Sequence, residues 1–215
     1  MATCRPRSTK RATISRRKSP DSHQPPSDIP GTIQLDTRDN SINAARGWLA
    51  SSTYRTFFDG FLGGNSSWQE FDIDVRTYRP LSSNARQTLA FWLLSALVTG
   101  GAAPYFDLPG TGGDFAGRSA RGYSEGRYRG PHLVYGEIEY RATLVPSGLF
   151  GIVGFMNTTT VDGAPDQKLF QSFAPAAGGG VRVLLDKRSK TNLCVDYGWG
   201  RQGSHGLYLG MQEAF

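Results

Sequence analysis

The sequence has little of several features on which common protein classes depend. Among its 215 residues only Cys4 and Cys194 are cysteines, and their wide separation excludes a disulfide framework and a cysteine-rich metal site. No apolar run reaches the roughly 18 residues of a membrane-spanning helix. The longest, LAFWLLSALV from Leu89 to Val98, has the length of a strand that crosses a bilayer at a tilt. Helical membrane proteins and disulfide-stabilised domains are therefore excluded.

The sequence also lacks the residue patterns of catalytic and cofactor sites. Its three histidines, His23, His132 and His205, have no metal-ligand spacing and lie in the N-terminal segment or in predicted turns. The glycine-rich GTGGDFAG lacks the lysine of a phosphate-binding loop, and no Gly-x-Ser-x-Gly motif occurs. Glu137 and Glu139 could form an acid/base pair, but arginines nearby favour structural ion pairs. We predict no enzyme, no cofactor and no metal.

The positive charge is concentrated at one end of the chain. The net charge is +6, yet residues 1–18 hold seven Arg and Lys and no acid, which leaves 17 bases against 18 acids in the remainder. Residues 1–31 are basic, polar and rich in proline, so we predict a disordered tail followed by one domain over residues 32–215. The first thirty residues contain no secretory signal, which leaves the start and the completeness of the chain open. A soluble nucleic-acid binder with a basic arm is a remote alternative, since no aromatic platform accompanies the arm; we expect no nucleic-acid partner.

Hydrophobic alternation with a period of two predicts an all-β protein. From Val134 to Leu144 the even positions are mostly apolar, whereas the odd positions include Glu137, Glu139 and Arg141. Turn signals such as RPLSSN and DKRSKTN separate the segments. Nine strands are expected, at about 33–38, 47–58, 68–79, 87–99, 133–145, 149–159, 177–186, 192–201 and 206–215.

The length of these strands favours a transmembrane β-barrel of the outer-membrane type over a soluble sandwich. Many predicted strands have ten or more residues, whereas about five or six is usual in globular proteins, and ten tilted residues match a bilayer. Nine is an odd number, while single-chain bacterial barrels have even numbers of strands. Either the first strand lies outside the barrel, or the chain is incomplete.

Several fragments, in order, resemble one family. The stretches LDTRDNSINAARGW, GGDFAGRSARGYSEGRYRG, EIEYR, DYGWG and GMQEAF resemble successive strands, the long loop and the last strands of the bacterial surface antigen family. That family comprises outer-membrane assembly and secretion barrels, BamA-like and TamA-like, and the resemblance concerns their C-terminal barrel. It implies a bacterial outer-membrane location, and it implies that the chain holds about half of a sixteen-stranded barrel.

The resemblance also implies roles for individual residues. The family's long loop folds into the barrel lumen through an Arg-Gly-Tyr/Phe motif, which falls here on Arg121, Gly122 and Tyr123. Its arginine contacts acids on the next two strands. The first falls on Glu139, but the second falls on Asn157, which could only accept a hydrogen bond from Arg121. We therefore expect a weakened clamp unless Glu137 replaces the missing acid.

The resemblance assigns a further role to the last strand, which the assembly machinery recognises by a terminal aromatic residue. Phe215 would fill this position, with Leu209 and Met211 on its face and Glu213 interrupting that face. The implied function is insertion, assembly or translocation of outer-membrane proteins. Implied partners are the outer-membrane bilayer, unfolded or nascent outer-membrane proteins, lipoproteins of the assembly machinery and N-terminal periplasmic modules. The alternative is a truncated or degenerate barrel that acts only as a pore or structural surface antigen.

Overall fold

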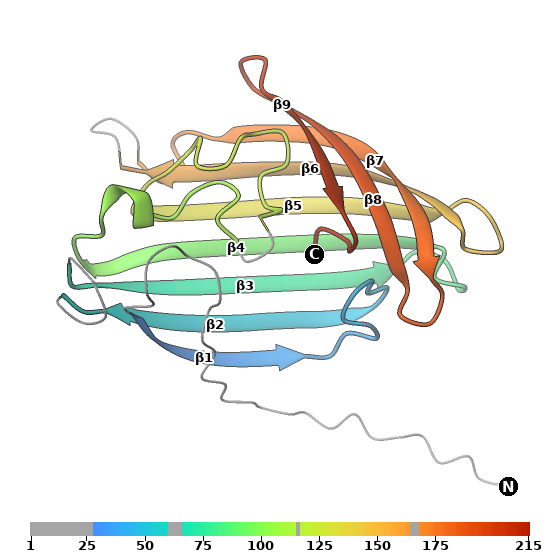
Figure 1. Cartoon of the computed structure of the whole chain (residues 1–215), viewed down its shortest axis with the longest axis horizontal. Helices are drawn as coiled ribbons and strands as arrows, with labels where there is room; N and C mark the ends of the chain where they lie inside the picture. Colours follow the sequence, from blue (N-terminus) through green and yellow to red (C-terminus); the bar gives the residue numbers. More distant parts are fainter. Residues whose placement is uncertain (1–27, 60–65, 115–116, 164–167) are drawn as a thin grey trace, which may run out of the picture.

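The computed structural model describes residues 28–59, 66–114, 117–163 and 168–215, which form a single antiparallel sheet. Its nine strands follow one another in sequence order and each pairs with the next (Figure 1). They are β1 (Asp28–Asp36), β2 (Gly47–Phe57), β3 (Trp68–Pro80), β4 (Gln87–Gly101), β5 (His132–Thr143), β6 (Phe150–Asp162), β7 (Ala174–Asp186), β8 (Thr191–Gly200) and β9 (His205–Gly210). The predicted all-β fold with nine strands is confirmed.

Two predicted boundaries at the ends of the sheet are wrong. The first strand begins at Asp28 rather than near residue 33, so the expected boundary between tail and barrel falls inside β1; residues 1–27 of the predicted tail lie outside the described residues. The last strand ends at Gly210 instead of continuing to Phe215. Continued pairing would place Glu213 on the apolar outer face together with Leu209. The chain instead turns toward the inner face, where Glu213 forms an ion pair with Arg182.

The two faces of the sheet differ as the alternation predicts. On β5, Tyr135, Glu137 and Glu139 are buried on the inner face, whereas Ile138 on the outer face is 50% exposed. Other exposed apolar side chains continue this outer band: Ile29, Ile33, Leu35, Trp48, Tyr54, Leu93, Tyr140, Phe150, Ile152, Met156, Val181, Leu193, Trp199, Leu207 and Leu209. Such a band suits a wall that faces lipid on its outer side.

The sheet is curled, and β7 to β9 turn over the side that carries the long β4–β5 connection (Figure 1). The strands β5 and β8 are not neighbours in the sheet. Because of the curl, their inner faces nevertheless contact one side chain, that of Arg121. Within the described residues the sheet does not close, because β1 pairs only with β2 and β9 only with β8. No helix in this part of the chain is long and apolar enough to cross a membrane.

Candidate functional site

The long connection between β4 and β5 folds back against the inner face. It contains a short 3-10 helix, η1 (Tyr105–Asp107), and a bridge between Gly110 and Arg129 that closes its second half into a loop. The backbone amide of Thr111 donates to the carbonyl oxygen of Tyr128 at 2.9 Å, which reinforces this closure. We call residues 117–130 the Arg-Gly-Tyr loop. Its fixed base positions Arg121 for contact with the wall.

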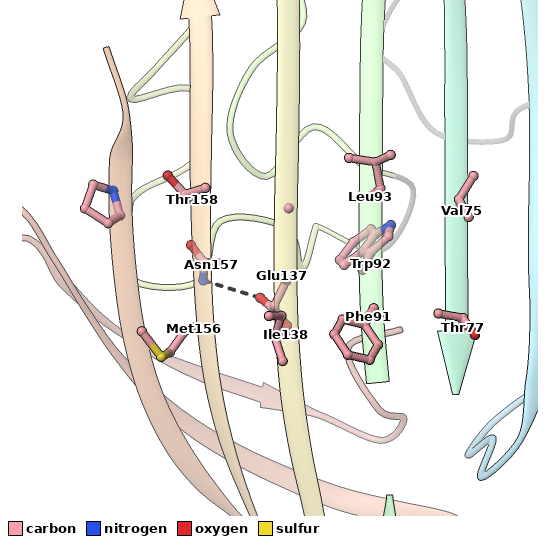
Figure 2. A pocket seen from close by; sticks show the side chains of 12 residues that line it. Val75, Thr77, Phe91, Trp92, Leu93, Glu137, Ile138, Met156, Asn157 and Thr158 are labelled. Carbon is pink, nitrogen blue, oxygen red and sulfur yellow. Dashed lines mark hydrogen bonds between the residues drawn. The ribbon is translucent and has the colours of Figure 1, made fainter. Parts of the chain in front are cut away.

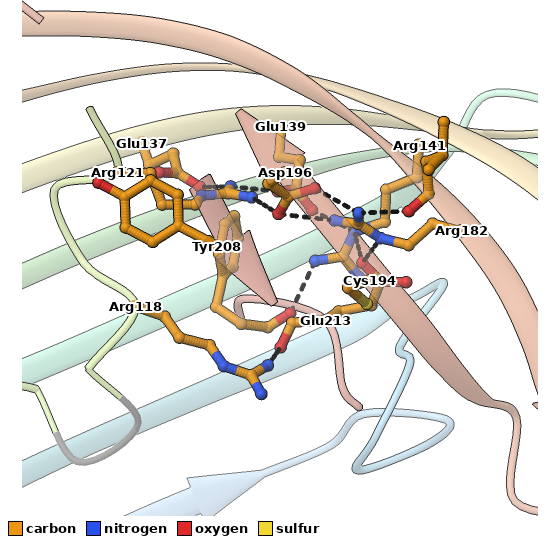
Figure 3. A network of polar contacts seen from close by, with 12 residues as sticks. Arg118, Arg121, Glu137, Glu139, Arg141, Arg182, Cys194, Asp196, Tyr208 and Glu213 are labelled. Atoms are coloured by element: carbon orange, nitrogen blue, oxygen red, sulfur yellow. Dashed lines mark hydrogen bonds and ion pairs between the residues drawn. The ribbon is translucent and has the colours of Figure 1, made fainter. Parts of the chain in front are cut away.

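Arg121 is surrounded by carboxylates from two strands. Its Nη2 donates to Glu137 and Glu139 of β5, and its Nη1 donates to Oδ2 of Asp196 on β8 at 2.6 Å (Figure 3). The side chains of Glu137 and Glu139 are fully buried, and that of Arg121 is 1% exposed. One guanidinium thus joins two strands that do not pair with each other.

The surroundings of Arg121 keep it charged. Burial alone would lower the pKa of its guanidinium, but the carboxylates of Glu137, Glu139 and Asp196 raise that pKa well above its usual value. The guanidinium carbon also lies 3.7 Å from the centre of the Phe155 ring, a cation–π contact. Removing one partner from such a buried cluster costs about 3–5 kcal/mol, because a charge is left uncompensated.

Glycines allow the loop backbone to approach the wall. Gly122 has a φ of +109°, and a Cβ atom there would lie 2.8 Å from the Cβ of Ala176. On β8, a Cβ atom at Gly198 would lie 2.8 Å from the backbone nitrogen of Gly122, and one at Gly200 would lie 2.5 Å from the Tyr123 ring. The Gly-Trp-Gly sequence of β8 therefore provides the surface on which the loop rests.

Two tyrosines fasten the loop beside Arg121. The hydroxyl of Tyr123 donates to the carbonyl oxygen of Pro175 at 2.5 Å and accepts from the amide of Arg201 at 2.9 Å. The hydroxyl of Tyr208, on β9, accepts from the amide of Gly122 at 2.8 Å and donates to the carbonyl oxygen of Tyr123 at 3.0 Å. The motif is thus attached to β7, β8 and β9 as well as to β5.

Asn157 does not accept the hydrogen bond that was expected from the Arg121 side chain. Instead of accepting from the Arg121 guanidinium, its Nδ2 donates to the carbonyl oxygen of Arg121 at 3.0 Å and to Oε2 of Glu137 at 3.3 Å. Both neighbouring atoms are acceptors, so the amide nitrogen of Asn157 faces them and the amide oxygen cannot take its place. The expected interaction is therefore wrong in its direction. The amide still holds the loop, while Glu137 and Asp196 supply the negative charge.

Sequence reasoning missed the wider ion network. Arg182 of β7 donates to both carboxylate oxygens of Asp196, through Nη1 and, at 3.2 Å, through Nη2, and its Nε donates to Glu213 at 2.7 Å. Arg141 of β5 donates to Oε1 of Glu139 at 2.6 Å. On β8 the alternation places Asp196 on the polar face, and Asp196 is the only charged residue of that strand. That signal could have marked Asp196 as a partner for the loop.

The residues expected to form a terminal strand signal are not on one strand face. Leu209 lies on β9 and is 72% exposed, and Met211, beyond the strand, is 64% exposed. Phe215 is only 5% exposed and lies on the inner face, with its ring centre 5.2 Å from that of Trp92. The shared face predicted for the three residues is therefore wrong, because the chain leaves the sheet after Gly210.

A cavity of about 560 Å³ lies on the other side of the wall (Figure 2). Most of its lining side chains belong to the outer face of β3 to β6, among them Leu93, Ile138 and Met156. A Cβ atom at Gly136, in the middle of this lining, would meet nothing within 4 Å. The missing side chain explains the hollow, which leaves the outer face apolar at the height of the ion network.

Comparisons with known proteins agree with this architecture. A family model described as "Omp85 superfamily domain" matches residues 3–200. Among solved structures, the fold is similar to the crystal structure of BamA from Haemophilus ducreyi lacking POTRA domains 1-3, with a TM-score of 0.67 and 14% sequence identity. The similarity covers 86% of this chain and 40% of that chain. A comparison with curated protein sequences gives no match.

Proposed function

The chain belongs to the Omp85 superfamily, and we propose that it forms part of an outer-membrane barrel wall that assists insertion or translocation of other outer-membrane proteins. The family and the BamA-like fold indicate the outer membrane as its location and assembly or translocation as its field of activity. The family is one of assembly and transport barrels, and we propose that this chain has no catalytic activity.

The observation that carries this proposal is the Arg-Gly-Tyr loop bound to the inner face. Arg121 joins β5 to β8 through Glu137, Glu139 and Asp196. We propose that this contact is a clamp, which keeps the curl of the sheet fixed while its edges pair with other strands. The loop resemblance seen in the sequence and the buried ion cluster support the same role.

The edges of the sheet offer backbone groups to an incoming chain. β9 has six residues and pairs with β8 only from Cys194 to Trp199, so this junction involves fewer residues than any other in the sheet. Within the described residues, β1 presents its second edge without a partner strand. An exposed edge can accept an added strand through main-chain hydrogen bonds. We propose unfolded outer-membrane proteins as the partners that use these edges.

A reconstitution experiment tests the proposal against a pore or structural antigen. The full chain is inserted into phospholipid vesicles, and an eight-stranded outer-membrane protein is added from urea. We expect the client to fold faster than with empty vesicles. Photo-crosslinkers at Ile33 of β1 and Leu209 of β9 should capture the client more often than one at Ile138 in central β5. All three sites are exposed on the outer face, so Ile138 is a matched control.

Equal folding rates with loaded and empty vesicles, together with equal capture at the three sites, would contradict assembly activity. Ion conductance without any effect on client folding would instead support the alternative of a pore. Partners such as lipoproteins of the assembly machinery or periplasmic modules belong to the same proposal and are tested by adding them to the assay.

A further inference from the structure

The residues after β9 cross the inner face instead of extending the sheet. We call Met211–Phe215 the inward segment. Glu213, Ala214 and Phe215 are 5%, 6% and 5% exposed, whereas Leu209 just before them is 72% exposed. The change from an exposed strand to a buried segment occurs within a few residues. This segment therefore has a binding site on the wall of its own molecule.

The wall binds the inward segment through two anchors. The carboxylate of Glu213 accepts from Nε of Arg182 at 2.7 Å and from Nδ2 of Asn192 at 2.8 Å. The ring of Phe215 packs against Trp92, and Nη2 of Arg141 donates to the backbone oxygen of Phe215 at 2.7 Å. One anchor lies on β7 and β8 and the other on β4 and β5. The segment thus spans the inner face from one side to the other.

The Arg-Gly-Tyr loop also contacts the inward segment. Nη1 of Arg118 donates to the carbonyl oxygens of Gln212 and Glu213, each at 2.5 Å (Figure 3). The backbone amide of Arg118 donates in turn to the carboxylate of Asp114 at 3.0 Å, which fixes the start of the loop. Arg118 lies three residues before Arg121. A single loop therefore carries both the contact with the wall and the contact with the segment.

The ion network also connects the inward segment with Arg121 of the loop. Arg182 donates to Glu213 of the segment and to Asp196, and Asp196 accepts from Arg121 of the loop. Loss of the segment would leave Arg182 with one carboxylate instead of two, and it would remove both acceptors of Arg118. Buried charges that lose a partner are costly, so the segment and the loop stabilise each other.

The pairing of β8 defines a second position for the segment. Cys194 of β8 lies opposite Gly210, and continuation of this register would place Met211 opposite Leu193 and Glu213 opposite Thr191. β8 begins at Thr191, so its backbone extends far enough to accept these residues. In that arrangement Glu213 would face outward with Leu209, away from Arg182. The same residues can thus either fill the inner face or lengthen the edge strand.

We propose that the inward segment is a latch with these two positions: bound to the inner face it fastens the Arg-Gly-Tyr loop, and released it lengthens β9 along β8. Withdrawal of the loop requires release of the segment, since Arg118 connects them. The latch thereby links the state of the loop to the length of the edge strand. This proposal does not rest on the proposed function, because it concerns contacts within the chain.

The chain contains a natural reporter for the latch. Cys194 is 4% exposed on the inner face, and its thiol donates to the carbonyl oxygen of Gln212 at 3.2 Å. Release of the inward segment uncovers this thiol. In a Cys4→Ser background, labelling by a water-soluble maleimide in lipid vesicles therefore measures the released fraction. We expect slow labelling of the folded parent protein and fast labelling after denaturation.

Two substitutions should accelerate the labelling of Cys194 by about tenfold or more, since each removes a buried or charge-assisted contact. Arg118→Gln removes the contact from the loop, and Phe215→Ala removes the anchor beside Trp92. Arg127→Gln is the matched control: it removes a cation from the same loop, but that guanidinium contacts Gln202 at 3.1 Å rather than the segment. The control should label at the parental rate.

Labelling of both test variants at the parental rate would overturn the latch. The link to the loop has its own readout, because Phe215→Ala should also accelerate hydrogen exchange at the amide of Gly122. Faster labelling with unchanged exchange at Gly122 would overturn that link. Far-UV circular dichroism checks that each variant folds. Should Phe215→Ala fail to fold, Arg118→Gln decides, since it leaves the wall side chains intact.

Discussion

Replacing Asn157 with aspartate provides a sensitive probe of the clamp, because the resemblance and the structure predict opposite results. The family pattern has an acid at this position, so restoring it should strengthen the contact with Arg121. In the structure, however, Nδ2 of Asn157 donates to the carbonyl oxygen of Arg121 and to Glu137 (Figure 2 shows the bond to Glu137). A carboxylate cannot donate to either atom. We therefore expect Asn157→Asp to destabilise the folded chain.

The magnitude follows from the two contacts. Leaving a buried acceptor without its donor costs about 1–3 kcal/mol, which is also the cost expected for Asn157→Ala. Asn157→Asp adds repulsion from Glu137. Two like charges at about 4 Å repel by about 4 kcal/mol at an effective dielectric constant of about 20, and we take about half of this to be offset by Arg121. Asn157→Asp should thus be less stable than Asn157→Ala by about 2 kcal/mol.

Urea unfolding in phospholipid vesicles, followed by tryptophan fluorescence, measures these differences through linear extrapolation. The excess cost of Asn157→Asp over Asn157→Ala is compared at pH 8 and at lower pH. It should shrink as the pH is lowered, because one carboxylate can then take up a proton and donate to the other. A variant Asn157→Asp that equals or exceeds the wild type in stability at pH 8 would refute this reasoning.

Three further substitutions test separate parts of the account. Gly122→Ala should cost about 1–3 kcal/mol because of its positive φ and its contact with Ala176. Gly117→Ala, also at positive φ but with its nearest neighbour, the carbonyl oxygen of Gly112, 3.9 Å away, should cost less. Equal losses of stability in urea unfolding would contradict the close approach of Gly122 to the sheet. Tyr208→Phe should cost about 1–3 kcal/mol by removing two hydrogen bonds to the loop backbone, and unchanged hydrogen exchange of the loop would argue against this. Met156→Arg should impair folding into vesicles by about 2–4 kcal/mol if the outer face contacts lipid, and undiminished folding would argue for a different environment.

The strands and their faces were predictable because they depend on local alternation. The odd positions of β5, including Glu137 and Glu139, are buried on the inner face as the period of two requires. The same rule places Asp196 on the polar face of β8. It contains no information about which strands meet across the curled sheet, and Arg121 and Asp196 are 75 residues apart in sequence. The sequence therefore predicts that the partners of the loop lie on the inner face, but it does not predict which inner-face residues they are.

The path of the last residues could not be predicted from alternation for a different reason. Leu207, Leu209 and Met211 fit an outer strand face, and the pattern alone favours a strand up to Phe215. The outcome depends on Glu213, whose carboxylate is bound by Arg182 on the inner face. Contacts with residues far away in sequence, among them the ion pair with Arg182 31 positions earlier, thus compete with strand pairing. Such competition between local pattern and long-range charge requires the structure.

Hydrogen exchange of the Arg-Gly-Tyr loop in Arg121→Ala tests the central claim, that this arginine clamps the loop to β5 and β8, most directly. The amide of Gly122 is the reporter, since it donates to Tyr208 in the clamped state. Loss of a buried ion partner, at about 3–5 kcal/mol, predicts exchange about 100-fold faster or more at this amide, with β3 and β4 still protected and Arg127→Ala behaving as the wild type. Exchange at Gly122 that is unchanged in Arg121→Ala would contradict the clamp.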